Sequence, residues 1–211
     1  MRQQATQVAR AGGLGFLLAL AALLSFTPAP TWPQAAPQAT VGDAVFQLDR
    51  TETKVNFILG ATMHTVHGTF QASRGRVEIS SASGALRGEI VVDAASGASG
   101  NASRDRKMHS EVLESERYPA ITFRPDRMEG TLAATGDSTV QVHGNFGIHG
   151  AEHELTVPIH VQINGGHWTA SAHFSVPFVQ WGMKNPSAFV FRVSQSVDVE
   201  LSATGTVAPT P

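Results

Sequence analysis

Histidines are the residues in this sequence whose chemistry and spacing come closest to a reactive site. His64 and His67 stand three positions apart, and His149 and His153 stand four apart with Glu152 between them. A zinc site needs three or four ligands that converge on one point. Residues three apart in a strand point to opposite faces, so His64 and His67 converge only at a turn or bulge. We therefore predict no metal site, and a His-based metal-binding protein stays the alternative.

The rest of the sequence offers no catalytic arrangement. It has no cysteine, which excludes disulfides, thiol catalysis and Cys-based zinc sites. It also lacks a Gly-x-Ser-x-Gly elbow, a Walker loop and a dinucleotide glycine pattern. The formal net charge of -2 argues against nucleic acid as a partner, because phosphates need a basic surface. We predict that the protein is not an enzyme and has no catalytic residues.

From residue 43 onward, most of the chain alternates apolar and polar residues. This pattern is typical of antiparallel strands that have one solvent-exposed face. The clearest runs are KVNFILG, GRVEIS, RGEIVVD, VQVHGNFGIHG, ELTVPIHVQING, HWTASAHFSV and FVFRVSQSVDVELSATG. Asn164–Gly166 reads as a hairpin turn. About eight such strands bury their apolar faces either in a sandwich or in a closed barrel. No Cys–Trp–Cys spacing favours the sandwich, so the prediction is all-β, an eight-stranded antiparallel barrel.

One segment departs from this pattern and predicts a short helix. Gly100–Pro119 is charged and helix-favouring, with Asn101 or Ser103 as the cap and Pro119 at its end. Met108 and Val112 lie four positions apart, and Leu113 is beside them, so one side of the helix is apolar. We predict that this helix packs against the barrel and closes one end of its interior.

Arg104 and Asp105 are the charged residues of this segment that carry the sharpest hypotheses. As an exposed pair they would contribute under about 1 kcal/mol. Alternatively, Arg104 folds under the helix and either fixes it to the barrel mouth or meets a polar ligand head group. The structural role is favoured, because a docked helix needs an anchor.

The N-terminal sequence predicts export. Arg2 and Arg10 precede the apolar run GGLGFLLALAALLSF, which is shorter than the roughly 20 residues that span a bilayer. We predict a signal peptide over residues 1–26 and a periplasmic or secreted protein, with an uncleaved N-terminal anchor as the alternative. Residues 27–42 then form a Pro/Ala-rich spacer, residues 43–207 a single barrel domain and residues 208–211 a tail.

Two motifs support a more specific interpretation. GNASRDRKMHSEVLESERYPAITFRP fits the pattern Gly-Asn-x-x-Arg-Asp, a short helix and Tyr-Pro-x-Ile-x-Phe, and VHGNFGIHGAEHELTVPI fits Gly-x-(Leu/Phe)-x-Ile-His-Gly. In this order they resemble the signature of the YceI-like family, also called polyisoprenoid-binding proteins, over roughly Val45 to Gly205. The resemblance implies an extended lipocalin-like barrel that holds a long isoprenoid chain, usually in an exported protein. In this motif His149 is expected to be a turn residue bonded to the backbone.

The chain departs from the family pattern at several lining positions. Val112 and Leu113 stand where many members have aromatic residues, and Lys107 stands where a His is common. Trp181 replaces a Phe in a segment that often reads Arg-x-Asp-Phe-Gly.

The function that follows is an exported, non-enzymatic protein that holds a polyisoprenoid or an isoprenoid-tailed lipid such as a quinone in the barrel lumen. No other cofactor is expected, and a homodimer and a transient membrane contact are left open. A structural or partner-binding envelope domain without a ligand is a further alternative, which predicts a lumen filled with side chains. The predicted ligand-binding residues are Phe57, Leu59, Phe70, Ile90, Met108, Val112, Leu113, Phe123, Phe146, Phe174, Phe178, Trp181, Phe189 and Phe191.

Overall fold

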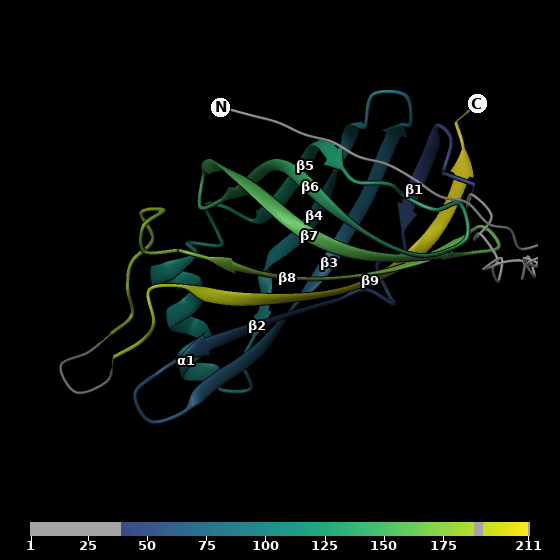
Figure 1. Cartoon of the computed structure of the whole chain (residues 1–211). Coiled ribbons are helices and arrows are strands. Elements are labelled where there is room, and N and C mark those ends of the chain that lie inside the picture. Colours follow the sequence, from purple (N-terminus) through teal and green to yellow (C-terminus); the bar gives the residue numbers. More distant parts are fainter. Residues whose placement is uncertain (1–38, 188–191, 211) are drawn as a thin grey trace, which may run out of the picture. The chain divides into compact units, whose positions relative to one another are not determined.

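The structure is a computed structural model that describes residues 39–187 and 192–210. The predicted signal peptide or anchor and most of the predicted spacer therefore lie outside the described residues. Strands of one antiparallel sheet make up most of the described chain (Figure 1). They are β1 Ala44–Leu48, β2 Lys54–Gly60, β3 Thr65–Ser80, β4 Ala85–Ala98, β5 Ala120–Glu129, β6 Gly136–Ile148, β7 Ala151–Asn164, β8 His167–Val176 and β9 Val197–Pro209.

The sheet closes into a barrel with eight strand positions. From β3 to β9 each strand pairs with the next along the chain. The first position is shared by β1 and β2, because both pair with β3 on one side and with β9 on the other. The prediction of an eight-stranded antiparallel barrel is therefore confirmed, with the first strand divided into two.

A compact turn divides the first strand. The Asp49 carboxylate accepts hydrogen bonds from the Thr51 amide (2.8 Å) and the Thr51 hydroxyl (2.6 Å). These two donors hold the pKa of Asp49 below its ordinary value. The Thr53 hydroxyl donates to the Asp49 carbonyl at 2.6 Å. The turn closes on its own polar groups, so the chain re-enters the same position of the sheet as β2.

The period-2 pattern places the apolar side chains inside the barrel. Along β7, for example, Val157, Val161 and Ile163 are buried, whereas Pro158, His160 and Gln162 are exposed. One buried cluster, which includes Leu48, Leu132 and Trp168, and a second, which includes Val112, Phe146 and Phe178, are both made of such side chains. In a meander, alternate connections lie at the same end, so the second cluster shares its end with the β6–β7 hairpin and the β8–β9 connection.

The predicted helix is present and lies at this end of the barrel (Figure 1). It consists of α1, Ala102–Lys107, followed directly by a π-helical turn, η1, Met108–Val112. The Asn101 side chain accepts hydrogen bonds from the Ser103 and Arg104 amides at 3.1 and 3.0 Å. Asn101 is therefore the N-cap of the helix, and it is one of the two residues predicted for this role. No helix within residues 39–187 and 192–210 is long and apolar enough to cross a membrane.

Backbone pairing extends to Thr40 near one terminus and to Pro209 near the other. Thr40 forms an isolated bridge with Ala133, and the Val41 amide donates to the Leu132 carbonyl at 2.9 Å. β9 continues to Pro209, into the predicted tail. It begins at Val197, and before it Val193 makes an isolated bridge with Ala61.

Candidate ligand-binding cavity

The barrel encloses an apolar cavity of about 870 Å³. Its volume lies in the range of small-molecule and cofactor sites. Side chains from every strand line it, and almost all of them are aliphatic or aromatic. The polar residues among the described lining are few, and we name this set the polar rim: Asn56, Ser99, Asn101, Ser103, Arg104, Lys107 and Thr122.

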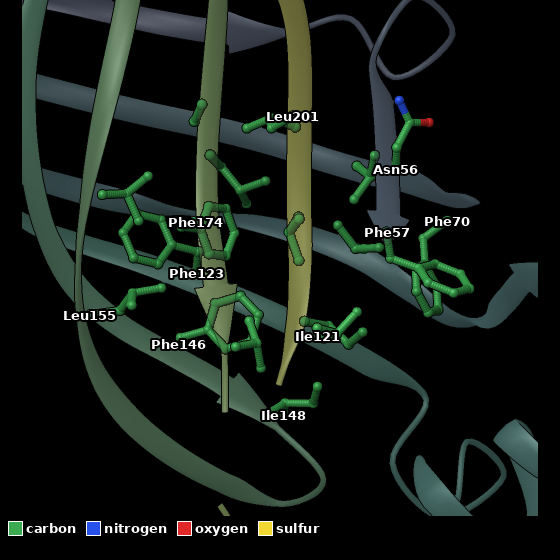
Figure 2. A pocket seen from close by; sticks show the side chains of 18 of the residues that line it. Asn56, Phe57, Phe70, Ile121, Phe123, Phe146, Ile148, Leu155, Phe174 and Leu201 are labelled. Carbon is green, nitrogen blue, oxygen red and sulfur yellow. The ribbon is translucent and has the colours of Figure 1, made fainter. Parts of the chain in front are cut away.

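Phenylalanines form much of the cavity wall (Figure 2). Phe57 from β2 and Phe70 from β3 lie beside each other, with ring centroids 5.4 Å apart. Phe146 and Phe174 lie edge to face with centroids 6.1 Å apart. The amide of Asn56 points away from the aromatic rings in this view. Rigid aromatic walls of this kind contribute large apolar area with little side-chain entropy to lose on binding.

One end of the cavity is closed by residues that the sequence reasoning did not select. The rings of Phe46 and Trp168 are 6.0 Å apart, and Leu132 lines the same cavity. The indole N–H of Trp168 donates to the Thr206 carbonyl at 3.0 Å, so the polar atom of this ring is satisfied. Trp168 stood in an alternating run, and the pattern could have identified it.

The opposite end is covered by the helix and by the β8–β9 connection. Met108, Val112 and Leu113 line the cavity from the helix, and Phe178 and Met183 line it from the connection. Gly97 allows this approach, because a Cβ there would lie 2.8 Å from Cε of Met108 and 2.5 Å from Cε1 of Phe70. The sequence reasoning missed Met183, because no periodic pattern marks a loop.

Two polar contacts join these two covering segments. The ammonium of Lys184 lies 2.5 Å from a carboxylate oxygen of Glu111, and Lys107 donates to the Pro186 carbonyl at 3.2 Å. Lys184 holds the pKa of Glu111 below its ordinary value, first through this hydrogen bond and then through its charge. The helix and the β8–β9 connection are therefore fastened together over the cavity.

The structure places the predicted ligand-binding residues as follows. All of them line the cavity except Trp181, Phe189 and Phe191. Phe189 and Phe191 lie outside the described residues. Trp181 does not line the cavity: its ring stacks on His153, with centroids 4.1 Å apart and an interplanar angle of 2°. The β6–β7 register pairs His153 with Phe146, so both side chains lie on the same face of the sheet, and Trp181 packs against this pair beside the cavity lining.

Arg104 and Asp105 both bind Ser99, the residue that follows β4. The guanidinium of Arg104 donates from Nε to the Ser99 hydroxyl at 2.7 Å and from Nη2 to the Ser99 carbonyl at 2.9 Å. The Asp105 carboxylate accepts from the Ser99 amide at 2.9 Å and from the Ser99 hydroxyl. These contacts fix the helix to the end of β4, which is the anchoring role favoured from the sequence.

The histidines are dispersed rather than gathered. Within residues 39–187 and 192–210, no three His, Cys, Asp or Glu side chains are placed to hold one metal ion. His64 and His67 are exposed. His109 Nε2 lies 2.8 Å from the Gly97 carbonyl and its Nδ1 lies 3.1 Å from the Ser115 hydroxyl, so the ring joins the helix to β4.

His149 is a turn residue, with φ of 53°, but its partner differs from the expectation. Its Nε2 lies 3.3 Å from the Glu114 carboxylate, not on a backbone group, and its ring packs on Tyr118 with centroids 4.8 Å apart. The two sequence motifs therefore contact each other, because Tyr118 and Glu114 belong to the first motif and His149 to the second.

A closed antiparallel barrel with an apolar lumen and a short helix over one end defines a lipocalin-like class of protein. The model of the YceI-like domain matches residues 46–205. The chain therefore belongs to the YceI-like family, and the resemblance seen in the sequence is confirmed.

Solved structures share this fold at low sequence identity. BcnA from Burkholderia cenocepacia is 19% identical with a TM-score of 0.62, and the match covers 75% of this chain and 99% of that one. A polyisoprenoid binding domain from Saccharophagus degradans, implicated in plant cell wall breakdown, is 18% identical with a TM-score of 0.62, covering 77% and 98%. The YCEI protein of Campylobacter jejuni is 13% identical with a TM-score of 0.56, covering 69% and 86%. No protein of curated function matches the sequence.

Proposed function

We propose that this chain is an exported, non-enzymatic binding protein that holds a polyisoprenoid or an isoprenoid-tailed lipid in the barrel cavity. The export part of the proposal is supported by the N-terminal sequence pattern alone. The lipid part is supported above all by one observation, the apolar cavity of about 870 Å³ that runs inside the barrel.

The shape and lining of the cavity suit a long hydrocarbon better than a compact polar molecule. The lining includes residues from both buried clusters, so the cavity reaches from Trp168 towards the helix. A polar ligand would leave its donors and acceptors without partners along such a wall. An isoprenoid chain has no polar groups to satisfy and fills the cavity by apolar contact.

Burial supplies the binding free energy. Removing each CH₂-sized group from water contributes about 0.8 kcal/mol, so several isoprene units give a large gross gain without any specific polar contact. Association and ordering of the chain offset part of this gain. The printed description of the Saccharophagus degradans neighbour as a polyisoprenoid binding domain agrees with this choice of ligand.

Mass spectrometry of an organic extract of the natively purified protein tests the proposal. We expect an isoprenoid lipid close to one molecule per chain, recovered without added lipid. The control is a similar extract of the variant Met108→Asp, which we expect to yield less lipid, because a carboxylate would stand in the apolar lining.

Two results would contradict the proposal. A native extract without lipid, from protein that also fails to bind an added isoprenoid alcohol, would refute the carrier function. Stoichiometric zinc in lipid-free protein would favour the metal-binding alternative.

A further inference from the structure

The barrel wall has a gap in its backbone pairing at the end that carries the helix. β7 pairs with β8 only over Ile159–Asn164 and His167–Ala172. Towards the helix, both strands continue beyond this pairing, and each stays paired with its other neighbour. We name the stretch without mutual pairing the β7–β8 gap, and it consists of Ala151–Pro158 of β7 and His173–Val176 of β8.

Pro158 explains where the pairing stops. A two-residue hairpin turn is closed by a hydrogen-bonded pair, here Asn164 and His167, and such pairs recur at every second residue of an antiparallel ladder. Counting back along β7 from Asn164 in steps of two reaches Pro158, whose nitrogen should donate to β8 at His173. Proline has no N–H, so the ladder ends one residue earlier, at Ile159.

Side chains close the gap in place of the backbone. Leu155 from β7 and Phe174 from β8 lie at the gap and line the cavity (Figure 2). Trp181, in the segment after β8, stacks on His153 of β7 with ring centroids 4.1 Å apart, and it packs on Phe146 with centroids 5.7 Å apart. The ring of Trp181 therefore joins the β8 side of the gap to the β7 side.

The contact between Trp181 and His153 can open without unfolding the segment that carries it. The Trp181 amide donates to the Pro177 carbonyl at 3.1 Å, and the Met183 amide donates to the Phe178 carbonyl at 3.0 Å. These bonds close a local turn that does not depend on the stacked rings.

The closed contact also leaves a polar atom unsatisfied. Among the residues that the structure describes, Nε2 of His153 is the one buried side-chain nitrogen or oxygen without a hydrogen-bond partner. Separation of the two rings gives this nitrogen access to water, and the hydrogen bond gained offsets part of the stacking lost.

We propose that the β7–β8 gap is the portal through which the lipid enters and leaves the cavity, and that Trp181 is its gate. This inference rests on the proposed function, because a portal requires a ligand in the cavity. Leu155 and Phe174 line the cavity, so parting the strands at these residues gives an apolar tail a sideways path into it. The helix need not move, and its polar anchor at Ser99 stays in place.

Stopped-flow mixing of the full chain, stripped of bound lipid, with dansyl-labelled geranylgeraniol in a cyclodextrin complex measures uptake, and a chase with unlabelled lipid measures release. We expect Trp181→Ala to accelerate both rates by at least about tenfold and to change Kd less than about threefold, because Trp181 does not line the cavity. Trp181→Phe keeps a ring on His153 and should retain the original rates.

Phe57→Ala is the matched control for Trp181→Ala. Phe57 lines the cavity from β2, away from the gap. Its loss removes contact with the bound lipid, so release should accelerate while uptake stays unchanged.

Pro158→Thr tests the portal from the opposite direction, because it restores the missing N–H at an exposed position. We expect the ladder to extend to His173, and both uptake and release to slow by at least about fivefold at unchanged Kd. His160→Thr is the control, because His160 is exposed on the same face of β7 but is already paired with β8. Thermal unfolding verifies that each variant is folded, and Pro158→Thr decides if Trp181→Ala is not.

The outcomes separate the two proposals. Uptake that is unchanged in folded Trp181→Ala or in Pro158→Thr would overturn the portal and leave the carrier function intact. Faster release from Trp181→Ala without faster uptake would also overturn it, because Trp181 would then act as part of the cavity wall. Failure of the unmodified chain to bind the labelled lipid would contradict the carrier function itself.

Discussion

Ser99 is the residue through which the helix is fixed to the barrel. Its amide and hydroxyl donate to Asp105, and its hydroxyl and carbonyl accept from Arg104. The Ser99 hydroxyl and amide, followed by the charge of Arg104, hold the pKa of Asp105 below its ordinary value of 3.8. The ionised form of Asp105 therefore stabilises the folded state.

The pH dependence of this contribution has a definite sign. Because the pKa of Asp105 is lower in the folded chain than in the unfolded chain, its stabilising effect is complete above pH 3.8 and disappears as the pH falls through the folded-state pKa. We expect Asp105→Asn to lower the free energy of unfolding by about 1 kcal/mol at neutral pH, the value for partly exposed hydrogen bonds to a charged group. Denaturant unfolding at a series of pH values should show this difference shrinking below pH 3.8. A difference that grows on acidification would refute this role.

Gly150, in the second sequence motif, occupies a position where a side chain would clash with Tyr118 of the first motif. Its φ is 76°, and a Cβ there would lie 2.4 Å from Cε1 of Tyr118. We expect Gly150→Ala to lower the melting temperature more than Gly165→Ala does. Gly165 also has a positive φ, of 57°, but has no atom within 4 Å of its Cβ position. The left-handed backbone costs roughly 1–2 kcal/mol in both variants, and only Gly150→Ala adds a clash. Equal losses in thermal unfolding would show that the Tyr118 contact does not matter.

At the scale of single residues, the alternating pattern correctly predicted which strand side chains face the inside of the barrel. Phe57, Phe123 and Phe174 follow the alternation, and all line the cavity. Trp181 was selected for its aromatic ring and its place in the family pattern, and neither property determines against which neighbours a loop side chain packs. The polar rim was not recognised as a set, because only the closure of the barrel brings Asn56 to the same cavity as the helix residues.

At the scale of elements, the helix and the β8–β9 connection act together as the cover of the cavity. Met108 approaches the wall over Gly97, and η1 continues the helix with a wider turn that carries Val112 inward. A π-helical turn inside an α-helix is uncommon and frequently accompanies a functional site.

A charge on the inner face of this cover should affect binding more than folding. We expect Met108→Asp to weaken the uptake of an isoprenoid alcohol by at least about tenfold, because the carboxylate would be desolvated against the lipid. In the lipid-free protein the side chain can remain hydrated, so the change in unfolding free energy should be smaller. Ser110→Asp, on the exposed side of η1, is the control and should bind normally. Unchanged affinity of Met108→Asp in a fluorescence titration would refute the covering role.

The Lys184–Glu111 pair, which joins the helix to the β8–β9 connection, should influence the rate of lipid release more than the equilibrium affinity for the lipid. The Lys184–Glu111 pair is largely exposed, and such pairs contribute at most about 1 kcal/mol. We expect Lys184→Gln to accelerate lipid release in a stopped-flow transfer assay while it changes the equilibrium affinity less than about fivefold. Release as slow as that of the unmodified chain would indicate that the pair does not hold the cover closed.

The elements were predictable to the extent that each carries its own periodic pattern. The strands and the Asn101 cap follow from local sequence. The division of the first strand into β1 and β2 depends on the Asp49 turn, after which the chain pairs with the same two neighbouring strands. A local sequence pattern does not predict which strands a segment will pair with. The described part of the alternating run before β9 forms no strand: Val193 makes only an isolated bridge, and β9 begins at Val197.

At the scale of the whole molecule, closure of the barrel turns separate amphipathic strands into a protected interior. β3 pairs with β4 as well as with β1 and β2, so the described strands close on one another and leave no unpaired edge strand. Outside, Arg124 pairs with Glu89 and Glu152, and links β4, β5 and β7 across the barrel wall. The polar outer face and the apolar interior are thus consequences of one alternating pattern.

The barrel lumen is the place where we propose the lipid is held, and a variant that fills it gives the most direct test. Ala170 lies on the inner face of β8 and lines the cavity, and its neighbour Ser171 is exposed. In a titration with geranylgeraniol, we predict that Ala170→Phe binds at least about tenfold more weakly than the unmodified chain, because its ring occupies the path of the tail. Ser171→Phe should bind normally. Full stoichiometry and unchanged affinity in a correctly folded Ala170→Phe protein would contradict the account.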